Sequence, residues 1–78
     1  MTRTQLEDSL AAIGVHTNSY CLDGVRHSDC VCVGVEDGKW RVFYVERNMP
    51  DELGVFDTVE AAYEFVYATF CKWLGIKN

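Results

Sequence analysis

Basic residues, proline and long apolar runs are all scarce in this sequence. Seven lysines and arginines stand against twelve acidic residues, which gives a formal net charge of −5, and there is one proline. Nucleic-acid backbones and anionic membrane surfaces select cationic proteins, so we expect direct binding to neither. No apolar run approaches the ~18 residues of a membrane span, and Glu7 and Asp8 stand where a signal peptide would be apolar. The sequence therefore predicts a cytoplasmic protein.

Signals for catalysis, metals and cofactors are also scarce. There is no glycine-rich loop, nucleophile elbow or paired-carboxylate motif, and we interpret His16 and His27 as solvated loop residues. Cys30 and Cys32 lack the Cys-x₂₋₄-Cys spacing of a zinc knuckle, and the remaining cysteines supply no second pair. We predict no enzymatic activity, no metal and no cofactor. The four cysteines are expected to be free thiols, with Cys30 and Cys32 packed as small apolar side chains.

The strongest structural signal is a β-hairpin over residues 30–47. Asp37-Gly38 supplies the positive φ values that a type I′ turn requires, and β-branched and aromatic residues extend on both sides. Because paired residues share a face, this turn predicts two surfaces. The one expected to lie under helices consists of Val31, Val33, Val35, Trp40, Val42 and Tyr44. The opposite one consists of Cys30, Cys32, Gly34, Arg41, Phe43 and Val45.

Helical periodicity precedes the hairpin. Leucine and isoleucine spacing predicts a helix over residues 5–13, with Thr4 and Glu7 forming a capping box. Gly14 is expected to take the left-handed conformation after this helix, and Val15 to make the apolar contact of a Schellman motif.

A second helix is predicted over residues 56–74. Asp57 is expected to cap it, with Glu60 reaching back from the first turn, and Gly75 to end it. The apolar arc expected to face the core contains Val59, Ala62, Tyr63, Val66, Phe70 and Trp73.

These elements predict a single α+β domain over residues 1–78. A short strand is expected at residues 18–23, a connection at 24–28 and a polar loop at 46–54, with Pro50-Asp51 as turn former. The order α-β-β-β-α then gives a two-layer fold, in which a three-stranded antiparallel meander is covered on one face by two helices.

Four residues are predicted to contact a partner. Asp51 and Glu52 fall in the expected loop and have no helix-capping role, so they are suited to a cationic partner. Phe65 is expected on the side of its helix away from the core, beside Glu64. An aromatic at such a position is either an isolated exposed residue or an interface anchor.

Residues 38–47 (GKWRVFYVER) and 56–65 (FDTVEAAYEF), joined by a short polar loop, resemble the immunity proteins of bacterial polymorphic-toxin and contact-dependent growth-inhibition systems. Together with the leading helix, the likeness covers most of the chain. Many proteins of that kind are small, acidic, cytosolic α-β-β-β-α domains. The resemblance implies a stoichiometric inhibitor that binds a cognate toxin domain, often a nuclease, but it carries over no toxin-contacting residue. We expect a monomer whose partner is a cationic nuclease domain, because a nuclease surface must hold phosphates.

Two other functions fit the same sequence. A phage- or plasmid-encoded inhibitor of a bacterial defence nuclease, anti-CRISPR-like or a DNA mimic, should carry a dense row of carboxylates. Here Arg26, Arg41 and Arg47 are interspersed among the acids. A structural or adaptor module should instead self-associate through the face that carries Cys30 and Phe43, which sedimentation or scattering would detect.

Overall fold

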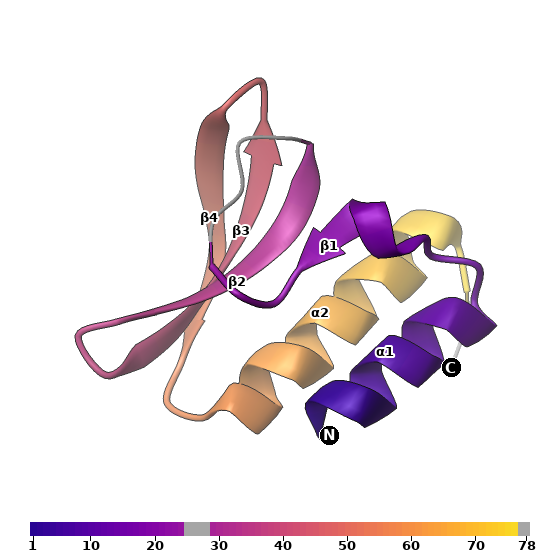
Figure 1. Cartoon of the computed structure of the whole chain (residues 1–78), viewed down its shortest axis with the longest axis horizontal. Helices are drawn as coiled ribbons and strands as arrows, with labels where there is room; N and C mark the ends of the chain where they lie inside the picture. The colour runs from indigo at the N-terminus through magenta and orange to yellow at the C-terminus, as the bar shows by residue number, and fades with distance from the viewer. Residues whose placement is uncertain (25–28, 77–78) are drawn as a thin grey trace.

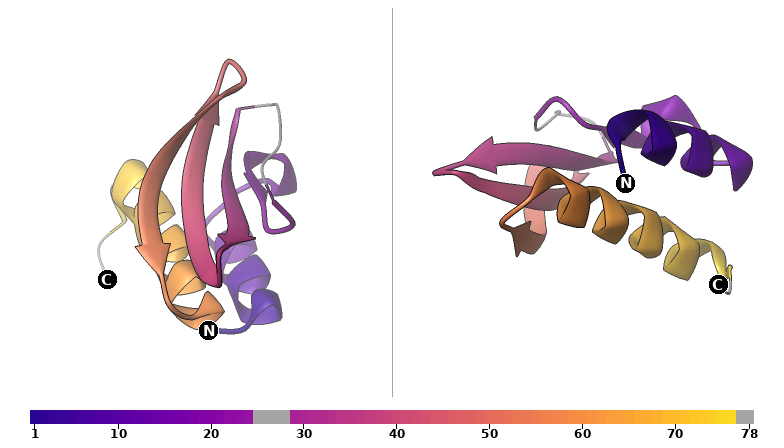
Figure 2. Two further views of the ribbon diagram at one scale, coloured as in Figure 1. Left: turned by 90° about the vertical axis from the view of Figure 1, so that its left-hand side faces the viewer. Right: turned by 90° about the horizontal axis from the view of Figure 1, so that it is seen from below.

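The predicted hairpin lies at the centre of the sheet in the computed structural model, which describes residues 1–24 and 29–76 (Figure 1). The elements in chain order are α1 (Arg3–Ala12), the 3₁₀ turn η1 (Thr17–Ser19), β1 (Tyr20–Cys21), β2 (Cys30–Glu36), β3 (Lys39–Glu46), β4 (Met49–Phe56) and α2 (Val59–Leu74). The four strands form one sheet in the order β1-β2-β3-β4. Helix α2 packs on β3, β4 and α1, and both helices lie on one side of the sheet (Figure 2). The predicted two-layer α+β fold is confirmed.

The register of the β2–β3 hairpin is the predicted one. Asp37 and Gly38 have φ values of 54° and 75°, and the strands pair antiparallel from Glu36 and Lys39 outward. The helix-side face is buried or partly buried except at Val35, which is 60% exposed. Val35 lies close to the turn, where the hairpin extends past the helices (Figure 1). Its predicted burial is therefore wrong.

Residues 46–54 form a strand and a second tight turn, so their prediction as a loop is wrong. Glu46 pairs with Met49 around Arg47 and Asn48, whose φ values are 51° and 64°. Both values are positive, as in a type I′ turn. Strand β4 is at the edge of the sheet, where proline is tolerated because its missing N–H breaks no ladder bond inside the sheet. Pro50 accordingly pairs with Val45 and forms no turn.

The segment after α1 forms less strand than predicted. Only Tyr20 and Cys21 pair, and they run parallel to β2, next to Val31 and Cys32. The antiparallel meander is therefore built from β2, β3 and β4, and the expected strand at residues 18–23 is not part of it. A strand of two residues is too short to show the alternation from which strands are predicted. Most of the predicted connection at 24–28, including His27, lies outside the described residues.

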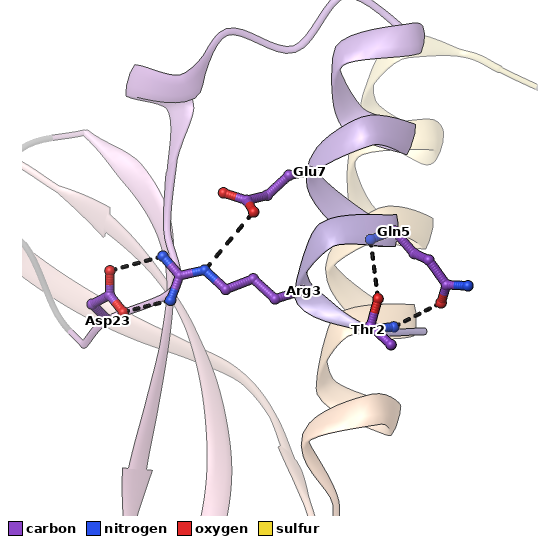
Figure 3. Close-up of polar contacts among 5 residues, drawn as sticks. All are labelled: Thr2, Arg3, Gln5, Glu7 and Asp23. Atoms are coloured by element: carbon purple, nitrogen blue, oxygen red, sulfur yellow. Dashed lines mark hydrogen bonds and ion pairs between the residues drawn. The ribbon is translucent and has the colours of Figure 1, made fainter.

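Helix α1 begins two residues earlier than predicted. Its capping box uses Thr2 and Gln5 instead of Thr4 and Glu7 (Figure 3). The Thr2 N–H donates to Gln5 Oε1 (2.8 Å), and the Gln5 N–H donates to Thr2 Oγ1 (3.2 Å). Glutamine serves as well as glutamate in this motif, so the sequence contains two overlapping capping boxes.

The end of α1 is the predicted Schellman motif. Gly14 has a φ of 86°, its N–H donates to the Ala11 carbonyl, and the Val15 N–H donates to the Leu10 carbonyl at 2.9 Å. Val15 packs against the core, as expected of the residue after the glycine.

Helix α2 is capped by Thr58, so the prediction of Asp57 is wrong. Thr58 Oγ1 accepts a hydrogen bond from the Ala61 N–H at 3.2 Å. The Asp57 carboxylate instead forms an ion pair with Lys39. The hydrogen bond that Lys39 donates, together with its positive charge, holds the pKa of Asp57 below its usual range. Gly75 ends the helix with a φ of 72°, as predicted.

Side chains are buried on both faces of the sheet. The larger cluster, between sheet and helices, contains Leu6, Leu10, Tyr20, Leu22, Val31, Val33, Val42, Ala62, Tyr63, Val66 and Phe70. The smaller cluster, on the other face, consists of Cys30, Cys32 and Val45, with Cys21 and Phe43 packed against it. The predicted packing of Cys30 and Cys32 is confirmed, and their Sγ atoms lie 3.3 Å apart.

An arginine–carboxylate contact fixes α1 to the segment after β1. The Arg3 guanidinium donates two hydrogen bonds to Asp23, at 2.7 and 2.9 Å, and its Nε lies 3.9 Å from Glu7 (Figure 3). The hydrogen bond to Asp23 raises the pKa of Arg3. Since the contact is exposed, we expect it to set the position of α1 more than it adds to stability.

The buried tyrosines predict a loss of stability at alkaline pH. Burial raises the pKa of Tyr20 and of Tyr63 above the ordinary value. Because the folded state favours the neutral phenol, this stabilisation is complete below about pH 10 and is lost as pH rises through the folded-state values. We expect the urea midpoint of the wild type to fall as the pH rises above about 10, and that of Tyr20→Phe/Tyr63→Phe to fall less. Equal losses in both proteins would contradict the assignment.

Candidate functional site

The acids predicted to contact a partner do not share one patch. Asp51 and Glu52 are successive residues of β4, so their side chains point to opposite faces of the sheet. Asp51 pairs with Tyr44 and is exposed on the helix side, whereas Glu52 pairs with Phe43 on the other side. The Glu52 carboxylate accepts a hydrogen bond from the Arg41 guanidinium at 2.8 Å. Glu52 caps no helix, as predicted, but it has an intramolecular partner on the sheet.

Phe65 was predicted to project away from the core, and this prediction is wrong. Its ring packs on Phe56 of β4, with the centroids 5.1 Å apart, and it contacts the larger core cluster. The prediction failed because it contained no strand β4, which covers this side of α2. Glu64 is exposed and lies 3.7 Å from the N-terminal amine of Met1. Partner contact by Asp51, Glu52, Glu64 and Phe65 stays a prediction.

A hollow of about 480 Å³ lies on the β3–β4 hairpin. One pair, Val45–Pro50, separates Tyr44–Asp51 from Glu46–Met49 in the ladder, so the side chains of these two outer pairs share the helix-side face. Met49 is 73% exposed. Within the part of the chain that the structure describes, no ion pair joins Glu46 or Asp51 to a basic group. We call this site the hairpin hollow; its lining residues are Tyr44, Glu46, Arg47, Met49, Pro50 and Asp51.

A groove of about 280 Å³ lies between β4 and the C-terminal half of α2. A β-bulge places Leu53 opposite no single partner, because Val42 pairs with Gly54 and Phe43 with Glu52. The groove is lined by Leu53, Phe65, Ala68, Thr69, Lys72 and Trp73.

The hairpin hollow and the groove adjoin at an aromatic contact. The Tyr44 and Trp73 rings meet edge to face, with centroids 5.4 Å apart and an interplanar angle of 70°. Trp73 also contacts Phe70, yet it is 50% exposed, so its predicted place in the core is wrong. Together the two concavities form one surface, which we call the hairpin–helix surface. In Figure 2 the β3–β4 hairpin extends beyond the helices, which leaves its end accessible.

Sequence reasoning missed the hairpin hollow because it treated Glu46, Met49 and Asp51 as loop residues. A usable signal was present. Tyr44 and Glu46 alternate with buried Val45 in the predicted strand, and Asn48 is a residue that tolerates positive φ.

Gly54 is required where the two aromatic rings cover β4. A Cβ atom there would lie 2.9 Å from two atoms of the Phe56 ring and 3.6 Å from Phe65. We expect Gly54→Ala to displace the Phe56 ring and lower the free energy of unfolding by about 1 kcal/mol. Chemical denaturation measures this loss. An unchanged midpoint would show that the ring moves without cost, and Phe56→Leu/Gly54→Ala should recover part of the loss.

Other features of the described residues indicate no metal or membrane site. No group of three or more His, Cys, Asp or Glu side chains in residues 1–24 and 29–76 is arranged to hold a metal ion. Over the same ranges, no helix combines the length and apolar character needed to cross a bilayer.

His16, which we interpreted as solvated, is exposed and also caps η1, since its Nδ1 accepts a hydrogen bond from the Asn18 N–H at 3.1 Å.

Comparison of the chain with protein families, with curated proteins and with solved structures finds no match. The fold and the hairpin–helix surface define the class of protein: a small α+β domain that exposes aromatic, thioether and carboxylate side chains together on one concave surface.

Proposed function

We propose that this chain is an immunity-type inhibitor, which binds a cognate toxin domain in the cytoplasm and neutralises it in a one-to-one complex. The observation that carries this proposal is the exposure of Met49 and Trp73 beside Glu46 and Asp51 on one surface. Aromatic residues and methionine are enriched in protein interfaces, and a rim of carboxylates selects among partners. The hairpin–helix surface is thus suited to a protein ligand.

The size of the domain is compatible with tight binding. A standard interface buries about 800 Å² on each partner. That is about one sixth of the 4930 Å² accessible surface of this chain. The two larger extents of the molecule are 32 and 28 Å, so one face can supply this area. Occupying a nuclease's substrate surface with such a face would exclude nucleic acid by steric overlap.

The charge distribution favours a cationic toxin domain over DNA mimicry. The net charge of −5 accelerates encounter with a cationic partner. A DNA mimic instead needs rows of unneutralised carboxylates at phosphate-like spacing. Here Arg3, Lys39 and Arg41 each neutralise an acid by direct ion pairing. The remaining acids lie in small groups and not in long rows, and this arrangement supports specific recognition of a protein surface.

Co-expression tests the proposal. The C-terminal domain encoded by the gene immediately upstream is induced in a naive host, with and without this chain. We expect growth arrest that this chain relieves and that an unrelated small acidic protein does not. Absence of toxicity, or toxicity that persists when this chain is present, would contradict the immunity function.

A further inference from the structure

We infer that the hairpin hollow receives a lysine or arginine side chain from a protein partner. This inference rests on the proposed function only in taking the partner to be a protein. It goes further in naming the position on this chain, the residues that hold the side chain and the chemistry of the group that binds.

The first argument is the arrangement of charge. Glu46 and Asp51 occupy diagonal positions on one face of the hairpin, since Tyr44 pairs with Asp51 and Glu46 with Met49. Residues at such diagonal positions lie about 7–8 Å apart, so a long cationic side chain placed between them can reach both carboxylates. Arg47 lines the same hollow, but within the described residues it forms an ion pair with neither carboxylate. An added cation between the two carboxylates would supply the ion-pair partner that neither has within the described residues.

The second argument is the apolar lining. Tyr44 presents an aromatic ring between the carboxylates and Trp73, and Met49 is largely exposed beside them. Lysine and arginine carry a long aliphatic stem that covers apolar surface and a charged head that stays with polar groups. The stem suits Met49, and the head gains attraction from the carboxylates and from the ring of Tyr44. The two carboxylates outnumber the single cation, Arg47, in the lining, so a glutamate, an aspartate or a phosphate from a partner is disfavoured at this position.

The adjoining groove extends the same contact. Its apolar lining includes Leu53, Phe65 and Trp73, next to the hollow at the Tyr44–Trp73 contact. A partner segment with a basic residue followed by an apolar one would occupy both concavities. Fully exposed single charges contribute little to affinity, so we assign the basic residue to specificity and association rate and the apolar residue to affinity.

A titration with a defined peptide tests the inference without the toxin. The probe is a short capped arginine–leucine peptide, and its control has citrulline, the neutral isostere, in place of arginine. Backbone amide NMR of the chain should show shifts at residues 44–51 and at Trp73, and the citrulline peptide should shift them far less. Equal shifts with both peptides, or shifts spread over the whole surface, would overturn the inference.

Matched variants complete the test. Glu46→Gln/Asp51→Asn should weaken binding of the arginine peptide by about tenfold. Asp8→Asn/Glu36→Gln removes the same charge from exposed sites outside the hollow and should change binding less than about twofold. Equal weakening by both pairs would show general electrostatic attraction and overturn the inference.

The toxin domain separates this inference from the proposed function. If the wild-type chain binds that domain and Glu46→Gln/Asp51→Asn binds it equally well, the inference fails and the immunity function stands. If the wild-type chain does not bind it, the immunity function fails. In that event the peptide titration still decides whether the hollow takes a basic side chain.

Discussion

Replacing Leu10 with alanine should lower the free energy of unfolding by about 3 kcal/mol. Leu10 is fully buried, and it and Leu6 are the buried residues of α1, so they hold this helix against the core. A domain of this size buries a modest share of its surface and has about 5 kcal/mol of stability in total. We therefore expect Leu10→Ala to unfold at much lower urea concentration than the wild type, as followed by circular dichroism.

Leu74 provides a matched control for this prediction. It is 53% exposed at the end of α2, so Leu74→Ala removes the same atoms from a solvated position. Its expected cost is less than about 0.5 kcal/mol. Similar losses of unfolding free energy for Leu10→Ala and Leu74→Ala would show that α1 does not pack against the core through Leu10.

Replacing Trp73 with alanine should weaken binding of the toxin domain by at least about thirtyfold, the factor that corresponds to 2 kcal/mol at an interface hot spot. Trp73 is half exposed, and its ring packs edge to face on both Tyr44 and Phe70, which restricts its rotamers. A large aromatic side chain that is already ordered loses little entropy when a partner covers it. Isothermal titration calorimetry with the upstream-encoded domain measures the change.

Val35 is the control for Trp73. It is an exposed apolar residue, 60% accessible, near the turn of the β2–β3 hairpin and outside the hairpin–helix surface. Val35→Ala should leave affinity within about twofold of the wild type. Comparable weakening of binding by both variants would place the interface elsewhere. So would an unchanged affinity of a Trp73→Ala variant that retains its fold.

The central hairpin could be predicted from the sequence because its information is local. Asp37-Gly38 fixes the turn, and once the turn is fixed, the two-residue period of a strand assigns every side chain to a face. The glycine after each helix acts in the same local way, since Gly14 and Gly75 both take the left-handed conformation. These predictions needed no knowledge of the tertiary structure.

The candidate site was not predicted because it depends on β4, whose sequence signals are weak. This strand contains Pro50 and successive acids, which are depleted in strands, and its turn at Arg47-Asn48 lacks glycine. Strand β4 forms because it pairs with β3 and because Phe56, at its end, packs against α2. The error then extended to α2, because the side on which Phe65 is covered depends on where β4 lies.

Trp73 shows a second limit of periodicity. Its position within the apolar arc of α2 is compatible with the core, but the arc says nothing of where the sheet under it ends. The burial of Phe70 and the half-exposure of Trp73, one turn apart, are set by the tertiary structure. The same half-exposure makes Trp73 available to a partner.

Hydrogen exchange of the chain, free and in complex with the upstream-encoded toxin domain, tests most directly that the hairpin–helix surface is the binding site. We predict slower exchange in residues 44–53 and in the C-terminal half of α2, with little change in α1. Protection confined to α1 and η1, or to the turn between β2 and β3, would contradict the account.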